Sequence, residues 1–341
     1  MKKKLLSVFE RQVVSPPPIW LMRQAGRYLP EYRALREKAG SFWAMGSTPK
    51  LAAELTLQPI RRFDFDAAII FSDILVVPVA FGIDVAIEEG FGPRLRAISS
   101  ASELVEDAQK WRDTVEPVYE AIGLVRSQLS PATALIGFAG GPWTLSTYLA
   151  QGHGSADQRA AKLWGYRNQI DFEELLDRVA RAVAEHLSGQ LSAGADVVQI
   201  FESWSAGLPL AVFERWVIEP TKKIVSLVRT KHPKARIIGF PRATSLEGYR
   251  LFAEKTGVSA ISVDTASPIT WAAQTLGRNF VVQGNLDPIA LLAGGEALQA
   301  ATDLILKATE KIPFIFNLGH GILPETPIAH VEQLVARVRG C

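Results

Sequence analysis

The sequence predicts a single α/β domain over residues 1–341, of the (β/α)8 TIM-type barrel class with an N-terminal extension. Three observations lead to this class: short apolar runs recur along the chain, helix-length stretches separate them, and nearly every run ends at a glycine or a polar residue. A barrel with insertions takes about 250 to 400 residues as one unit. No Gly/Ser linker, charge block or low-complexity segment divides the chain, so we expect one domain.

Eight apolar runs are predicted as strands. They are 19–22, 67–71, 134–138, 197–201, 236–240, 260–263, 280–282 and 313–316. Strands that alternate with helices pair in parallel, because right-handed helical crossovers join parallel neighbours. An open doubly wound sheet is the alternative. It needs polar residues mainly at its switch point, whereas here they follow nearly every run, which favours the barrel.

The stretches between the runs have helical patterning. The clearest is 171–193, where apolar residues recur at spacings of three and four. His186 lies beside that apolar stripe, and a structural histidine is the favoured interpretation there. The other predicted helices are 50–62, 102–128, 208–231, 246–254, 289–309 and 328–339.

The composition is that of an ordinary globular enzyme. It is 48% hydrophobic and 21% charged, and a formal charge of +2 makes no basic field suited to nucleic acid. Residues 1–9 contain too few apolar residues for a signal-peptide core. The most apolar stretch, 67–83, is interrupted by Asp73 and Pro78 and is too short to cross a bilayer. We expect a cytoplasmic protein with no nucleic-acid or membrane partner.

Metal and nucleotide chemistry have little support in the sequence. The single cysteine, Cys341, allows no intrachain disulfide and no zinc site built on thiolates. The five histidines have no metal-binding spacing, so we expect no metal. Neither a GxxxxGK[ST] loop nor a GxGxxG after a strand is present, so we expect no nucleotide cofactor.

The strand ends supply candidate functional residues, because barrel enzymes build their sites there. The residues just past the runs are Arg23, Asp73, Gly140 with Gly141, Glu202 with Ser203, Arg242, Asp264, Asn285 and His320.

Arginines are concentrated after the first run. Arg23 and Arg27 are four residues apart with Gly26 between them, and Arg33 and Arg36 follow on the next helical turn. Each guanidinium can bind one carboxylate bidentately, so the cluster suits a ligand with several carboxylates. A solvated basic face is the alternative interpretation.

Asp73 interrupts one of the most apolar runs in the chain. A buried carboxylate without partners is costly, so Asp73 must cap a backbone group, pair with an arginine, or meet a cationic or N–H bearing ligand. Arginines predicted at the same strand ends favour the ligand interpretation over a cap at Ile74 and Leu75.

Three further polar side chains are candidates. Tyr148 lies one turn into the helix that Pro142 is predicted to start, although spacing alone fits a core tyrosine equally well. Ser203 follows the fourth run. His320 follows the eighth run between two glycines, which leave room for a ligand.

Five motifs resemble the uroporphyrinogen decarboxylase family over essentially the whole length. They are Met22-Arg-Gln-Ala-Gly-Arg-Tyr-Leu-Pro-Glu31, Phe71-Ser-Asp-Ile-Leu75, Gly141-Pro-Trp-Thr-Leu145 with Tyr148, Gly284-Asn-Leu-Asp-Pro288 and Asn317-Leu-Gly-His-Gly321. The segment after Ser203, Trp204-Ser-Ala-Gly-Leu208, departs from the family's usual spelling.

The resemblance implies a single barrel, commonly a homodimer, without metal or organic cofactor. It implies the removal of CO2 from the four acetate side chains of uroporphyrinogen III, giving coproporphyrinogen III in tetrapyrrole biosynthesis. The catalytic residues it implies are Asp73, Arg27, Tyr148 and His320. The substrate-binding residues it implies are Arg23, Gln24, Ala25, Gly26, Arg27, Arg36, Phe71, Asp73, Tyr148, Ser203 and His320.

The implied chemistry fits these residue types. Protonating a pyrrole carbon turns the ring into a cationic electron sink, so the substrate acts as its own cofactor. Asp73 would accept the pyrrole N–H groups and stabilise that cation. Arg27, His320, Tyr148 and a bound water are the candidate proton donors, and the weak acidity of arginine argues against Arg27.

Two rival functions are considered. A methyltransferase of the same superfamily would use zinc with cysteine and histidine ligands, but this chain has only a terminal cysteine. A non-catalytic tetrapyrrole-binding protein would hold carboxylates with the same arginines and release no CO2.

Overall fold

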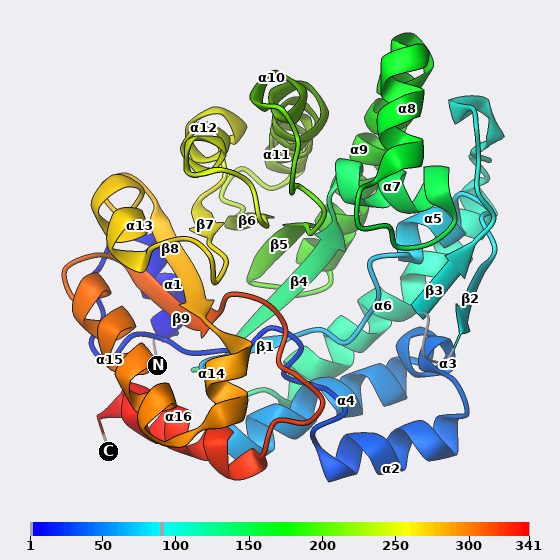
Figure 1. The fold of residues 1–341 in the computed structure, drawn as a ribbon. Helices are drawn as coiled ribbons and strands as arrows, with labels where there is room; N and C mark the ends of the chain where they lie inside the picture. The colour runs from blue at the N-terminus through cyan, green and yellow to red at the C-terminus, as the bar shows by residue number, and fades with distance from the viewer. Residues whose placement is uncertain (1–2, 89–91, 341) are drawn as a thin grey trace.

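The fold is a curled parallel β-sheet with helices packed outside it (Figure 1). The computed structural model describes residues 3–88 and 92–340; Cys341 lies outside this range. The seven strands are hydrogen-bonded in the order β1-β4-β5-β6-β7-β8-β9, and every neighbouring pair is parallel. Their bounds are β1 (Ala67–Ile69), β4 (Ala134–Gly140), β5 (Val197–Glu202), β6 (Ile237–Pro241), β7 (Ala260–Ser262), β8 (Val281–Leu286) and β9 (Phe314–Leu318).

The first predicted strand, 19–22, is not a strand of this sheet. Ile19 makes one parallel bridge to Phe316, and its carbonyl accepts the amide N–H of Asp66 at 3.0 Å, so the segment lies between β9 and the start of β1. Side chains accept most of the N–H groups of this segment, which a strand would donate to backbone carbonyls. The N–H groups of Ile19, Leu21 and Met22 donate to the side chains of Asp66, Gln24 and Asn317.

The helices predicted at 50–62, 246–254 and 328–339 lie within two residues of their predicted bounds, whereas the helix predicted at 102–128 begins at Ala108. The helices over Phe42–Ser47, Val76–Ala80, Arg159–Arg167 and Ile269–Thr275 were not predicted. The helices of the structure surround the sheet (Figure 1). They are α2 (Pro30–Ala39), α3 (Phe42–Ser47), α4 (Pro49–Phe63), α5 (Val76–Ala80), α6 (Ala108–Gln128), α7 (Pro142–Gln151), α8 (Arg159–Arg167), α9 (Gln169–Ser192), α10 (Leu210–Phe213), α11 (Glu219–Lys231), α12 (Leu246–Thr256), α13 (Ile269–Thr275), α14 (Pro288–Ala293), α15 (Gly295–Thr309) and α16 (Ile328–Arg339).

Two predicted helices are divided. The 289–309 stretch breaks at Gly294, whose φ of 69° suits glycine, and becomes α14 and α15. The 208–231 stretch is α10 and α11, joined by a π-helical turn over Glu214–Ile218. The antiparallel hairpin β2 (Val85–Glu88) and β3 (Gly92–Leu95) was not predicted.

The predicted helix 171–193 is confirmed as α9. Its apolar stripe packs inward, and His186 is buried, with Tyr119 Oη 3.2 Å from His186 Nδ1. Burial lowers the pKa of His186 to about 4, so this histidine is a neutral structural residue, as predicted.

Side chains of the strands alternate between the concave face of the sheet and the helices, as the two-residue period of a strand requires. The concave face buries small and branched residues with Phe240, and α1 (Lys4–Phe9) adds Leu5 and Val8 beneath it. This face also holds a polar chain. Trp20 Nε1 donates to Gln283 Oε1 at 3.0 Å, and Gln283 Nε2 donates to Gln199 Oε1 at 3.1 Å.

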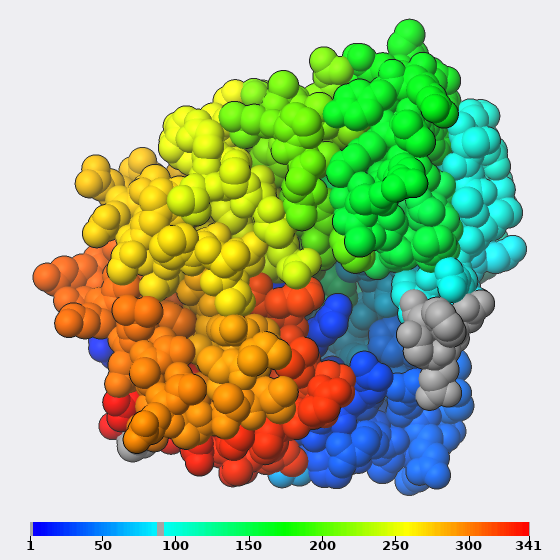
Figure 2. Space-filling view, viewed as in Figure 1, coloured from blue at the N-terminus to red at the C-terminus, as the bar shows by residue number. Residues whose placement is uncertain are grey.

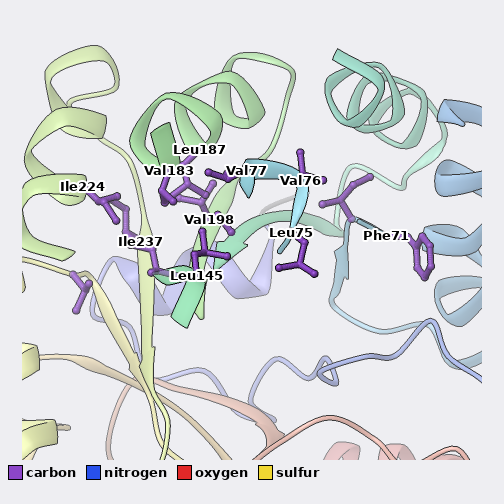
Figure 3. Close-up of a cluster of buried hydrophobic side chains, with 14 of the residues drawn as sticks. Phe71, Leu75, Val76, Val77, Leu145, Val183, Leu187, Val198, Ile224 and Ile237 are labelled. Atoms are coloured by element: carbon purple, nitrogen blue, oxygen red, sulfur yellow. The ribbon is translucent and has the colours of Figure 1, made fainter. Parts of the chain in front are cut away.

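The other face of the sheet packs against the helices (Figure 3). Val198 and Ile237 from adjacent strands lie beside Val183 and Leu187 of α9, and all four are fully buried. Leu75 and Val76 extend this cluster from the segment that follows β1. The packing therefore fixes the chain just after Asp73.

In the described part of the chain, no helix is both long enough and apolar enough to cross a membrane.

Leu5→Ala is expected to destabilise the fold without reaching the strand ends. Leu5 is 0% exposed, and removing such a core leucine costs about 2 to 5 kcal/mol. Urea unfolding followed by circular dichroism measures the loss. Leu304→Ala is the control, because Leu304 is 58% exposed, and an equal loss in both variants would contradict the role given to α1.

Candidate active site

The carboxyl ends of the strands form one face of the molecule, here called the strand-end face. Figure 2 shows a hollow there, bounded by N-terminal (blue), C-terminal (red) and central (green) parts of the chain. Arg23, Asp73, Tyr148 and His320 lie on this face, and the charge of Arg23 lowers the pKa of each of the other three. The structure thus brings together four residues from distant motifs.

Arg23 is held by the end of β9 and the loop that follows it. Met22 donates its N–H to Asn317 Oδ1 at 2.9 Å and accepts the N–H of Ile322 at 3.0 Å. The Arg23 side chain lies against Gly321, where an added Cβ would be 2.3 Å from Arg23 Cδ. Its φ of 61° is uncommon for a residue other than glycine.

The Arg23–Arg27 turn is rigid. Gln24 is 0% exposed, and its side chain accepts the N–H of Leu21 at 3.1 Å and donates to the carbonyl of Ala67 at 3.1 Å. An added Cβ on Gly26 would come within 2.9 Å of the Arg23 carbonyl, so glycine is required. The Gln24 side chain is occupied by the fold, whereas Ala25 and Gly26 remain partly exposed.

Arg27 and Arg36 lie on the α2 side of the face. Both act on the pKa of Tyr32, which burial raises and these two charges lower. Tyr32 packs edge-on against Phe71, with ring centroids 5.9 Å apart. Phe71 is buried, and its N–H donates to Thr56 Oγ1 at 2.8 Å.

Asp73 makes the backbone cap that was one of its two predicted roles. Its Oδ1 accepts the N–H of Leu75 at 2.7 Å, so it caps the turn before α5. Burial raises its pKa, while the bond from Leu75 and the charge of Arg23 lower it. Its charge also raises the pKa of Tyr148, so the carboxylate faces the other site residues.

Tyr148 is carried by α7, and Glu202 holds the start of that helix. Glu202 is 0% exposed and accepts the N–H of Trp143 at 3.0 Å, the N–H of Thr144 at 2.8 Å and the Thr144 hydroxyl at 2.7 Å. Burial raises the pKa of Glu202 to about 7 against these three bonds. A Cβ on Gly141 would be 2.2 Å from Glu202 Cδ, which explains the glycine of the Gly141-Pro-Trp-Thr-Leu145 motif.

The loop after β5 completes this side of the site. Ser203 is half-buried, and its carbonyl accepts a bond from Arg242 Nη1 at 3.4 Å. The ring of Trp204 packs edge-on against Tyr148, with centroids 6.2 Å apart. The segment that departs from the family spelling is therefore in contact with the site.

His320 is a neutral side chain at ordinary pH. Burial, with the charges of Arg242 and Arg23, lowers its pKa to about 4. A neutral imidazole can donate one hydrogen bond and accept another. His320 can therefore offer hydrogen bonds to a ligand, whereas the positive charge on this face comes from the arginines.

An aromatic floor lies below these polar groups. Phe138, Phe201 and Phe240 pack edge to face in series, with centroids 5.6 and 6.1 Å apart. Phe138 and Phe201 are partly exposed. A flat apolar ligand with charged groups on its edge matches such a floor.

Three functional features were missed by sequence reasoning: the position of Arg242 beside His320, the cap by Glu202 and the phenylalanine floor. Arg242 and Glu202 stood among the strand-end residues but carried no motif that singled them out. The inward direction of Phe138 and Phe201 follows from strand alternation, once the strand register is known.

Other features do not compete with this site. Within residues 3–88 and 92–340, no three His, Cys, Asp or Glu side chains gather as a metal site would require. Two surface clefts lie elsewhere, one beside Trp43 and Lys110, the other beside Pro16 and Lys307.

Gly141→Ala is expected to destabilise the protein by about 1 to 3 kcal/mol, because the new methyl group overpacks against Glu202. Thermal unfolding measures the change. Gly46→Ala is the matched control, since a Cβ on Gly46 has no neighbour within 4 Å. Equal stability of the two variants would contradict the close approach of Glu202.

Comparison with known proteins gives one consistent family. The family model for uroporphyrinogen decarboxylase (URO-D) matches residues 1–341. Proteins named uroporphyrinogen decarboxylase from Brucella anthropi and Brucella canis are each 51% identical over 342 residues, which is 100% of this chain and 99% of theirs.

Solved structures show the same fold. A methyltransferase from Methanosarcina mazei has a TM-score of 0.83 at 20% identity, covering 99% of this chain and 97% of that one. A B12-independent methionine synthase from Shewanella sp. W3-18-1 has a TM-score of 0.56 at 12% identity, covering 94% and 92%. Identities this low carry the fold alone, whereas the full-length matches above carry the family: this chain belongs to the uroporphyrinogen decarboxylase family.

Proposed function

We propose that this chain decarboxylates the four acetate side chains of uroporphyrinogen III to methyl groups, giving coproporphyrinogen III and CO2 in tetrapyrrole biosynthesis. Family membership supports the activity. The observation that carries it to this chain's own residues is Asp73, a carboxylate near Arg23 and Tyr148 on the strand-end face.

The arrangement suits a polyanionic macrocycle. Arg23 and Arg27 are exposed, and neither has an ion-pair partner among the residues that the structure describes. Their guanidinium groups are free to bind carboxylates on the ring edge. The apolar ring would lie over Phe138 and Phe201, with its pyrrole N–H groups directed at Asp73.

The reaction needs no electron acceptor besides the substrate. A proton adds to the pyrrole carbon beside the acetate-bearing one, and the ring becomes a cation. The bond from the methylene carbon to the carboxylate breaks, CO2 leaves, and its electron pair neutralises the cation. A proton then adds to the methylene carbon and the ring proton departs, so each acetate consumes one proton and becomes a methyl group.

Asp73 would stabilise the cation as it forms. A preorganised group of this kind contributes about 3 to 4 kcal/mol, whereas enzymes lower barriers by about 8 to 23 kcal/mol. Orientation by the arginines and proton delivery supply the rest. The lowered pKa of His320 leaves its imidazole largely unprotonated near pH 7, whereas Tyr148, whose pKa is raised, keeps its proton but gives it up less readily.

The decisive experiment is anaerobic incubation with uroporphyrinogen III, followed by oxidation and chromatography of the porphyrins. A ladder from eight to four carboxylates is the expected result. Unchanged substrate, with binding retained, would favour the non-catalytic tetrapyrrole-binding protein instead.

The proposal extends to the assembly and the barrel. We infer a cytoplasmic homodimer, as the family resemblance implies, and a closed barrel in which residues 18–22 take the eighth position. The bonds that this segment makes to Phe316 and Asp66 support closure. Sedimentation at the mass of two chains is the result expected of the dimer.

Asp73→Asn is expected to lower kcat about a hundredfold to a thousandfold and to leave KM within a few fold. The amide can still cap Leu75 but has no charge to stabilise the cation. Rates of coproporphyrinogen formation measure this. Asp64→Asn is the control, because the Asp64 side chain is 89% exposed. Wild-type turnover in purified Asp73→Asn would remove Asp73 from the mechanism.

Arg23→Lys is expected to raise KM about tenfold, because lysine lacks the guanidinium fork that binds a carboxylate bidentately. Initial rates across substrate concentrations separate KM from kcat. Arg181→Lys, on the outer face of α9, is the control and should match wild type. A fall confined to kcat would show that Arg23 acts on the chemical step and not on binding.

A further inference from the structure

Arg242 stands directly after β6 in a loop held from two sides. Its own N–H donates to the Glu202 carbonyl at 3.0 Å, and the next N–H, of Ala243, donates to Asp264 Oδ2 at 2.5 Å. Asp264 is buried and also accepts both the N–H and the hydroxyl of Ser267. The loop is therefore fixed at the strand-end face before any ligand binds.

The Arg242 side chain turns across the strand ends. Its Nη1 donates to the carbonyl of Ser203, after β5, at 3.4 Å, and its charge lowers the pKa of His320, after β9. The loop after β7 contacts both neighbouring segments. Its Asp264 accepts the N–H of Ala243, next to Arg242, and its Thr265 lies so close to Gly319, next to His320, that an added Cβ on Gly319 would be 2.3 Å from the Thr265 nitrogen. Arg242 thus belongs to the same group of strand-end loops as Ser203 and His320.

This guanidinium has no acidic partner. Across 3–88 and 92–340, Arg242 makes no ion pair, and Asp264, the nearest carboxylate in sequence on the neighbouring strand end, is occupied by backbone and hydroxyl groups. Arg23 is likewise unpaired in that range and acts on the same histidine. Two unpaired guanidinium groups around a neutral imidazole make an anion-binding position.

The arginines of the strand-end face are distributed over two of its sides. Arg27 and Arg36 are associated with α2, which lies across the strand ends from β6 (Figure 1). A ring with carboxylates around its whole edge needs cations on both sides. The α2 side has two arginines, and Arg242 is the cation contributed by the β6 side.

We propose that Arg242, with Arg23, clamps a carboxylate of the tetrapyrrole on the β6 side of the strand-end face, with His320 hydrogen-bonded to the same group. The assignment rests on the proposed function, because the tetrapyrrole is the ligand. It adds a substrate-binding residue to those that the motifs indicate.

Arg242→Met and Arg242→Lys test the clamp, with Arg181→Met as the control on the outer face of α9. In the full-length protein, Arg242→Met should raise KM for uroporphyrinogen III about tenfold to a hundredfold, with a smaller change in kcat. Arg242→Lys should recover part of the loss. Equilibrium binding of coproporphyrinogen III, measured anaerobically, should weaken in the same order.

Nuclear magnetic resonance of the His320 ring gives a readout that general unfolding does not. Removing the Arg242 charge should raise the pKa of His320 in the folded protein without ligand, whereas Arg181→Met should leave it unchanged. An unchanged KM and an unchanged His320 pKa in Arg242→Met would overturn the clamp.

The outcomes separate this inference from the proposed activity. Wild-type protein that binds coproporphyrinogen III more tightly than Arg242→Met but releases no CO2 would overturn the activity and keep the clamp. Normal turnover and binding in Arg242→Met would do the reverse.

Discussion

The arrangement of the site depends on how the chain is held between β9 and β1. Three side chains, Asp66, Gln24 and Asn317, accept N–H groups of residues 19–22 that a strand would donate to a neighbouring backbone. These bonds leave the chain free to turn sharply at Arg23 instead of continuing as a strand. The arginine then lies over Gly321, and its charge lowers the pKa values of His320 and Asp73.

The three buried titratable groups of the site, Glu202, Asp73 and His320, have different roles. Glu202 is fully buried, and both of its carboxylate oxygens accept hydrogen bonds from the first residues of α7. Its role is therefore to position α7 and, with it, Tyr148. One oxygen of Asp73 accepts the N–H of Leu75. The charge of Arg23 lowers the pKa of Asp73, and the charge of Asp73 raises the pKa of Tyr148. His320 loses its charge to burial and to two arginines, which leaves it a neutral hydrogen-bonding group. Similar burial therefore has different consequences, set by the partners that each group meets.

The apolar and charged parts of the face are complementary. Phe138 and Phe201 are partly exposed and can contact a ligand, because strand alternation directs them to the concave face near the carboxyl ends of β4 and β5. Arg23, Arg27 and Arg242 lie in loops and Arg36 lies in α2, so the guanidinium groups come from outside the strands that carry the floor. A ring-shaped ligand with an apolar centre and an anionic edge meets both at once.

The sequence by itself determined the α/β class, the order of seven strands and most helices, because apolar periodicity and strand-end residues are local signals. It also indicated Arg23, Asp73, Tyr148 and His320, because each of these residues lies in or beside a short motif of consecutive residues. The strand predicted at 19–22 is reduced to a single bridge at Ile19, because the side chains of Asp66, Gln24 and Asn317 accept three of its N–H groups. Only the tertiary structure decided that Asp73 both caps and faces the site, that Glu202 serves α7, and that Arg242 lies beside His320. Each of those depends on contacts between residues far apart in the chain, and no local pattern encodes their distance.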